Sequence, residues 1–119
     1  MAQQATRIVL LPRYTSLVGP SGVSGNTDFL TPPVNVRAFA SADIVGWLGL
    51  NPGDAPTFTL QQSPDLVTWS DLDTVDADSS QPVTVFEDLR TEWVRLKGTV
   101  PHGARFSCWV VGEFTLRSA

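Results

Sequence analysis

The chain has only one cysteine and one histidine among its 119 residues, and this scarcity excludes the commonest metal and redox sites. The single thiol, Cys108, forms no internal disulfide, and a structural zinc site takes four Cys or His ligands. His102 lies between Pro101 and Gly103 in a predicted turn, away from any strand-turn-helix context that would hold a nucleophilic serine. We therefore predict no catalytic, metal or cofactor site, no enzymatic activity, and a Cys108 that packs as a small buried apolar side chain.

Charge is also scarce. Charged residues make up 17% of the chain, with twelve acidic against eight basic ones and a net charge of −4. This balance, with basic residues dispersed along the sequence, disfavours nucleic acid or an anionic membrane as a partner. No stretch approaches the roughly 20 apolar residues of a membrane helix, and the apolar run 8–11 is too short for a signal-peptide core. We expect a protein made in the cytoplasm and used in soluble form.

The carboxylates form no recognisable catalytic or metal-binding pattern. Glu87 and Asp88 are adjacent, so on a strand they point to opposite sides, which is a poor arrangement for acid and base catalysis. A second group of acids lacks the glycine and glutamate that a calcium loop of the EF-hand type places at fixed positions. We predict that these are solvated turn residues: Asp65, Asp71, Asp73, Asp76 and Asp78.

Helical periodicity is nearly absent, so strands must carry the fold. Candidate strands recur with Gly and Pro turn signals between them, at 6–12, 34–40, 43–50, 57–62, 67–72, 83–87, 92–98 and 105–116. Short strands at this spacing predict an all-β fold, an antiparallel β-sandwich of about eight strands in one domain spanning residues 1–119.

Residues 14–33 resist assignment to a strand. Glycines at 19, 22 and 25 make one end flexible, and the pair Pro32-Pro33 makes the other end stiff. A segment of this kind is unsuited to a sheet interior and is uncommon in a compact domain unless it is functional. We predict a long loop or arm at 14–33 that becomes ordered on docking to a partner.

The last predicted strand carries large apolar residues on both faces. Alternation places Cys108 and Val110 on the core face and Trp109 and Val111 on the outer face. The strand before it places Trp93 on an outer face in the same way. Large exposed aromatics in a monomer indicate burial against another layer or another chain, although a one-residue bulge would reverse the facing.

Tryptophan on a sheet face also suits sugar rings, whose apolar faces pack on indoles. Trp47 or Trp93 is the candidate platform for such a carbohydrate-binding or adhesion module. A base-stacking role for Trp93 beside Arg95 and Lys97 is weaker because of the acidic net charge.

Residues 58–72, FTLQQSPDLVTWSDL, resemble a segment that recurs in small β-sandwich proteins of tailed-phage virions. Residues 34–39, VNVRAF, followed by a Trp-bearing apolar strand, are similar to the same type of module. The resemblance implies a jelly-roll-like head decoration or cement protein, or a related tail or fibre accessory, that assembles on the virion without catalysis.

This resemblance leads to a specific expectation of function. The protein is expected to decorate and stabilise a phage capsid by binding the major capsid protein as a symmetric oligomer, most simply a homotrimer. Carbohydrate remains the alternative partner, for a tail or fibre accessory. The residues that we expect at the interface are Trp93, Trp109, Val111, Arg95, Tyr14 and Phe29.

Overall fold

The computed structural model describes residues 5–18, 27–49, 56–101 and 105–117. The regular secondary structure of these described residues consists of β-strands, without a helix. They form two five-stranded sheets. The strands are β1 (Ala5–Val18), β2 (Thr27–Leu30), β3 (Val34–Asn35), β4 (Phe39–Leu48), β5 (Thr57–Ser63), β6 (Ser70–Val75), β7 (Ala77–Asp78), β8 (Val83–Phe86), β9 (Trp93–Val100) and β10 (Arg105–Leu116). Within the described residues, no helix could cross a membrane.

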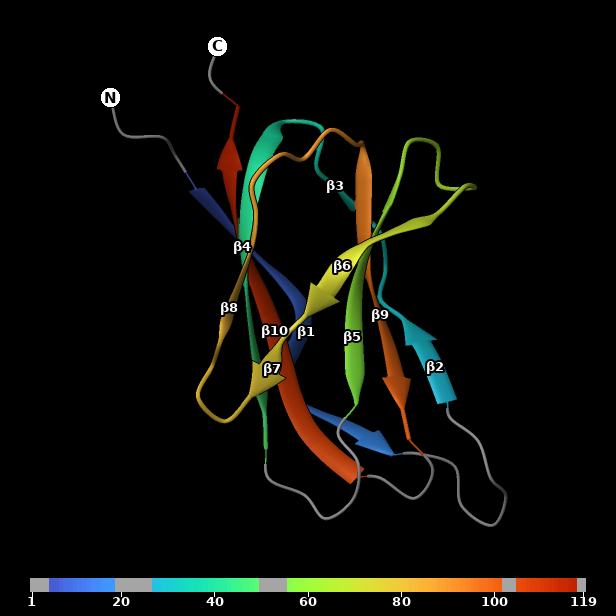
Figure 1. Ribbon diagram of the computed structural model, residues 1–119, viewed down its shortest axis with the longest axis vertical. Helices are drawn as coiled ribbons and strands as arrows, with labels where there is room; N and C mark the ends of the chain where they lie inside the picture. The colour runs from blue at the N-terminus through green and yellow to red at the C-terminus, as the bar shows by residue number, and fades with distance from the viewer. Residues whose placement is uncertain (1–4, 19–26, 50–55, 102–104, 118–119) are drawn as a thin grey trace.

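Sheet A contains β1, β10, β4, β7 and β8, and sheet B contains β2, β3, β9, β5 and β6. Figure 1 shows them as two layers, with β4 and β10 in one and β5 and β9 in the other. The antiparallel pairs are nested: β1 with β10, β2 and β3 with β9, β4 with β8, and β5 with β6. A long hairpin rolled up in this way is a jelly roll. The predicted all-β sandwich of jelly-roll type is confirmed, although the described residues form ten strands instead of about eight and the pairing is mostly, not entirely, antiparallel.

The core lies between the two sheets and follows the period of two expected for strands. Along β9, Val94 and Leu96 are fully buried, while Trp93, Arg95 and Lys97, which alternate with them, are half-buried. Along β10, Cys108, Val110 and Phe114 are fully buried. Side chains from both sheets join in one apolar cluster, so the two layers are held together mainly by the hydrophobic effect.

The expectation of an arm at 14–33 is wrong where the structure describes that segment. β1 continues to Val18, because its second half pairs with the first half of β10, for example Thr15 with Cys108. β2 adds a further strand on the edge of β9. Pro12 does not stop β1 because it lies in an irregularity of the register, between Leu11 and Thr15, where a missing N–H group is tolerated. Residues 19–26 lie outside the described residues.

Other segments also differ from the sequence prediction, and residues 67–69 of the strand expected at 67–72 lie in the loop before β6. Residues 34–40 were expected to form one strand, but β3 ends at Asn35 and β4 begins at Phe39. Asp73 and Asp78 were expected to be turn residues, yet Asp73 lies in β6 and Asp78 in the short β7, which pairs in parallel with β4. Edge pairing of this kind needs little apolar sequence, because one face of the strand stays in water.

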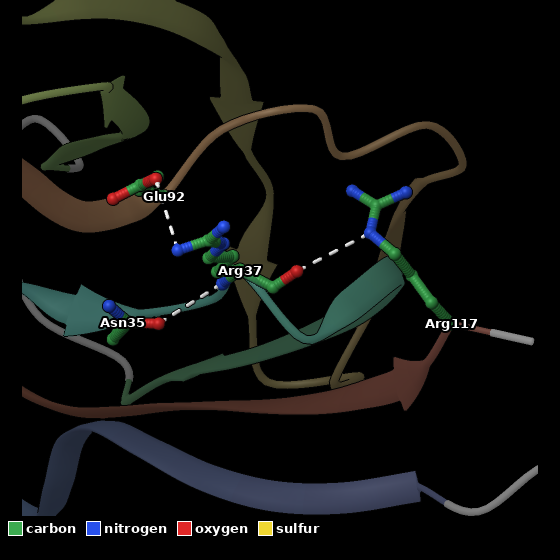
Figure 2. A network of polar contacts seen from close by, with 4 residues as sticks. All are labelled: Asn35, Arg37, Glu92 and Arg117. Atoms are coloured by element: carbon green, nitrogen blue, oxygen red, sulfur yellow. Dashed lines mark hydrogen bonds and ion pairs between the residues drawn. The ribbon is translucent and has the colours of Figure 1, made fainter. Parts of the chain in front are cut away.

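A polar network joins the end of β10 to the two connections beside it (Figure 2). Nε of Arg117 donates to the backbone oxygen of Arg37 at 3.3 Å, and its Nη2 donates to the backbone oxygen of Leu89. The backbone N–H of Arg37 donates to Oδ1 of Asn35 at 3.2 Å. Nη1 of Arg37 lies 3.9 Å from Oε1 of Glu92. Arg117 therefore satisfies backbone acceptors in two loops at this end of the sandwich.

Candidate functional site

The two large residues on the outer face of β10, Trp109 and Val111, are buried, contrary to expectation. Trp109 is only 9% exposed and Val111 only 6%. Their facing is as predicted, because Cys108, Val110 and Phe114 belong to the core cluster while Trp109 and Val111 do not. The prediction that Trp109 and Val111 are left exposed was wrong. Both lie on β10 between β1 and β4, where cross-strand neighbours pack beside them.

A row of four valines crosses the outer face of sheet A. The register pairs Val9 with Val111, Val111 with Val45, and Val45 with Val83, so the row runs over β1, β10, β4 and β8. We call these residues the valine row. Its two ends, Val9 and Val83, are each 55% exposed. The row is therefore an apolar stripe that is open to solvent at both ends.

Charged residues lie beside the valine row. The residues two positions along each strand from the valine row form a second cross-strand row. In it, Arg7 pairs with Glu113, Glu113 with Asp43, and Asp43 with Val85. All three charged residues are exposed, and Val85 is a third valine of this face that is 55% exposed. On the other side of the row, Trp109 pairs with the half-buried Trp47. An apolar stripe flanked by charges has the composition of a protein contact surface.

The remaining residues predicted at the interface lie apart from the valine row. Trp93 is half-buried on β9 of sheet B, so Trp93 and Trp47 belong to different sheets and form no common aromatic platform. Phe29 packs on the core, with its ring edge-on to Phe58 at a centroid distance of 6.4 Å. Tyr14 lies on β1, but its side chain is outside the described part of the structure.

Arg95 is held in a network on the outer face of sheet B. Its guanidinium lies 3.9 Å from the ring centroid of Trp69, a cation–π contact. Its Nε donates to Oε1 of Gln61 at 2.8 Å, and Nε2 of Gln61 donates to Oδ1 of Asp71 at 2.9 Å. Gln61 is only 8% exposed. We call this group, together with the neighbouring Lys97, the Arg95 site.

The sequence indicated Arg95 but not the side chains that contact it, Gln61 and Trp69. Register explains the contact with Gln61, because the two residues are opposite each other on β9 and β5. The contact with Trp69 depends on the loop that returns the chain from β5 to β6. Strand alternation was the only available signal, since it places Gln61 and Arg95 on polar faces.

An open depression of about 360 Å³ adjoins the Arg95 site. Its volume is within the range of small-molecule sites, roughly 300–1,000 Å³. Two cationic side chains, one carboxylate, one amide and two apolar side chains form its walls. The lining residues are Asp28, Phe29, Leu30, Gln61, Arg95 and Lys97.

The loop between β5 and β6 is rigidly built around Asp65. Its Oδ1 accepts the backbone N–H groups of Thr68 at 2.8 Å and Val67 at 2.9 Å, and the hydroxyl of Ser63 at 3.1 Å. Those backbone hydrogen bonds, with Thr68 first, lower the pKa of Asp65 because they favour its ionised form. Leu66 takes a positive φ of 69°, and its backbone oxygen accepts Nε1–H of Trp69 at 3.2 Å. The loop thus presents Trp69 to Arg95.

The remaining residues considered from the sequence are Cys108, five aspartates and His102. Cys108 is fully buried, as predicted, and burial raises the pKa of its thiol to about 11. The five aspartates considered for calcium are all exposed, and the described residues contain no group of three or more metal-ligating side chains. His102 lies outside the described residues.

The fold and these surfaces define a small jelly-roll β-sandwich with an apolar outer face on sheet A and a polar one on sheet B. Comparison with protein-family models, with curated proteins and with solved structures finds no match for this chain.

Proposed function

We propose that this protein is a non-catalytic structural protein of a tailed-phage virion, which decorates and stabilises the capsid by binding its outer surface as a symmetric trimer. The observation that carries the proposal is the valine row, an apolar stripe across four strands with exposed ends. The resemblance of residues 58–72 to segments of virion proteins supports it. So does the jelly-roll topology, which is common in viral capsid domains, although a fold by itself does not define a function.

The contact surface in this proposal is the outer face of sheet A. Val9, Val83 and Val85 are each 55% exposed. Complete burial of a valine side chain stabilises by roughly 1.5–3 kcal/mol, so covering the remaining half of each contributes of order 1 kcal/mol. Copies of this chain contact one another through this face, and the trimer that they form engages the capsid at three points and gains affinity from its multivalency. Trp109 and Val111, already buried in their own chain, support this face rather than contact the partner.

The charges beside the valine row influence which partner this face binds. Arg7, Glu113 and Asp43 form an exposed row of mixed sign along its side. Charges at the rim of an apolar contact select the partner more than they add affinity. The partner is the major capsid protein together with further copies of this chain, and the location is the surface of the virion after synthesis in the host cytoplasm.

The experiment is to compare Val83→Glu with Val67→Glu by light scattering coupled to size-exclusion chromatography. Both valines are exposed, at 55% and 81%, but Val67 lies in the loop between β5 and β6. The wild type and V67E are expected to elute as trimers, and V83E as a folded monomer by circular dichroism. A wild-type monomer, or a V83E trimer, would contradict the proposal. An electron-microscopy map of the intact particle then tests whether the chain lies on the capsid surface.

A further inference from the structure

We propose that the depression beside the Arg95 site binds an acidic sugar residue, a uronic or sialic acid, with Arg95 and Lys97 taking the sugar carboxylate. This site is on the outer face of sheet B, whereas the valine row is on the outer face of sheet A. The two surfaces belong to different layers of the sandwich, so the inference does not depend on the proposed function.

Arg95 and Lys97 form a local positive patch in an acidic protein. They are two residues apart on β9, so their side chains lie on the same face, and both line the depression. The ion pairs within the described residues are Arg37–Glu92 and Arg90–Asp88, so neither Arg95 nor Lys97 forms an ion pair with a described carboxylate. With Asp28 on the same lining, the depression keeps an excess of one positive charge. In a chain of net charge −4, two adjacent cations in one depression attract an anionic group from solution.

The guanidinium of Arg95 is fixed in place before any ligand binds. Trp69 covers one face of it, and Gln61, itself bonded to Asp71, holds Nε. Within the described residues the terminal Nη nitrogens make no hydrogen bond. A planar guanidinium with its orientation set and its outer N–H groups available matches the two oxygens of a carboxylate. Preorganisation of this kind reduces the entropy lost on binding.

The rest of the depression favours a sugar over other anions. Asp28 accepts the hydroxyl of Thr99 at 2.8 Å through Oδ1, and its carboxylate can also accept hydroxyl groups of a ligand. The same carboxylate repels a phosphate dianion or an acidic peptide, which brings several negative groups, more strongly than a sugar with a single negative charge. Leu30, 52% exposed on the same rim, offers apolar surface to the C–H face of a sugar ring. The combination of cations, a hydroxyl acceptor and apolar surface fits a sugar that carries one carboxylate.

The test is an NMR titration of the full chain with sodium D-glucuronate and with N-acetylneuraminate, and methyl glucoside is the neutral control. The side-chain amide of Gln61 and the Nε–H of Arg95 are the reporters because both lie in the depression. Lys97→Gln is the main variant, since the Lys97 side chain makes no hydrogen bond or ion pair with other described residues. Arg95→Gln is the second variant, and Arg90→Gln, an exposed arginine paired with Asp88, is the matched control.

We expect at least one acidic sugar to shift both reporters, with affinity about tenfold lower in K97Q and lower still in R95Q, and unchanged in R90Q. Affinity should fall with added salt. Four outcomes would overturn the proposal: neither acidic sugar binds, methyl glucoside binds equally well, K97Q and R95Q bind like the wild type, or inorganic phosphate or an oligoglutamate peptide binds more tightly than either sugar. The first result in a protein that still trimerises would leave the proposed function standing.

Discussion

Phe29 occupies the space that a side chain on Gly98 would need. The two residues face each other on β2 and β9, and Cε1 of Phe29 lies 2.1 Å from the position that a Cβ on Gly98 would take. The ring also packs edge-on against Phe58. Glycine in the middle of this strand is thus required by the close approach of a neighbouring aromatic ring.

Gly98→Ala is therefore expected to destabilise the protein by about 1–3 kcal/mol, the usual cost of overpacking a core. Urea unfolding followed by tryptophan fluorescence measures it. Phe29→Leu provides the control through a double-mutant cycle. If the clash with the ring is the cause, the double variant loses less stability than the sum of the two single variants. Strict additivity would show that the cost of G98A arises elsewhere.

Arg117→Ala should lower the free energy of unfolding by about 1 kcal/mol, because it removes hydrogen bonds from a charged group to two backbone oxygens. Arg37→Ala is the matched control from the same network (Figure 2). Its ion pair with Glu92 spans 3.9 Å between side chains that are 79% and 46% exposed, and exposed pairs of this kind contribute between about 0 and 1 kcal/mol. A cost of R37A equal to or greater than that of R117A would contradict this assignment.

Asp65 is expected to make stability depend on pH. Its pKa is lower in the folded protein than its ordinary value of 3.8, so its contribution is present above that value and is lost as the pH falls through the folded pKa. Between about pH 4 and pH 2, the wild type should lose more unfolding free energy than Asp65→Asn does. Asp76→Asn changes an exposed carboxylate that accepts no hydrogen bond within the described residues. It should retain the wild-type pH profile, and thermal unfolding at each pH is the measurement.

Strand alternation was sufficient to predict the fold class. The inner residues of β9 and β10 follow the period of two, and Trp109 and Val111 have the outer facing that the sequence predicts. The nested strand pairing also agrees with the jelly-roll-like fold that was expected. The length of β1 was not predictable in this way, because Pro12 is normally a strand breaker, and only pairing with β10 carries β1 past it.

The candidate sites were less predictable than the fold. Exposure of Trp109 was predicted incorrectly because alternation gives a side for each residue but not what packs on that side. The valine row could not be predicted from the sequence for a related reason. Its four members come from four segments of the chain and become neighbours only through the register of β1, β10, β4 and β8.

By itself, the sequence determined that strands build the molecule and which side chains of each strand face the core, because side-chain direction in an extended chain is a local property with a period of two. Only the tertiary structure decided which outward residues meet water and which meet one another. That decision depends on strand order and register, which arise from contacts between residues far apart in the chain. Arg95 thus lies against Trp69, and Val9 is in line with Val83.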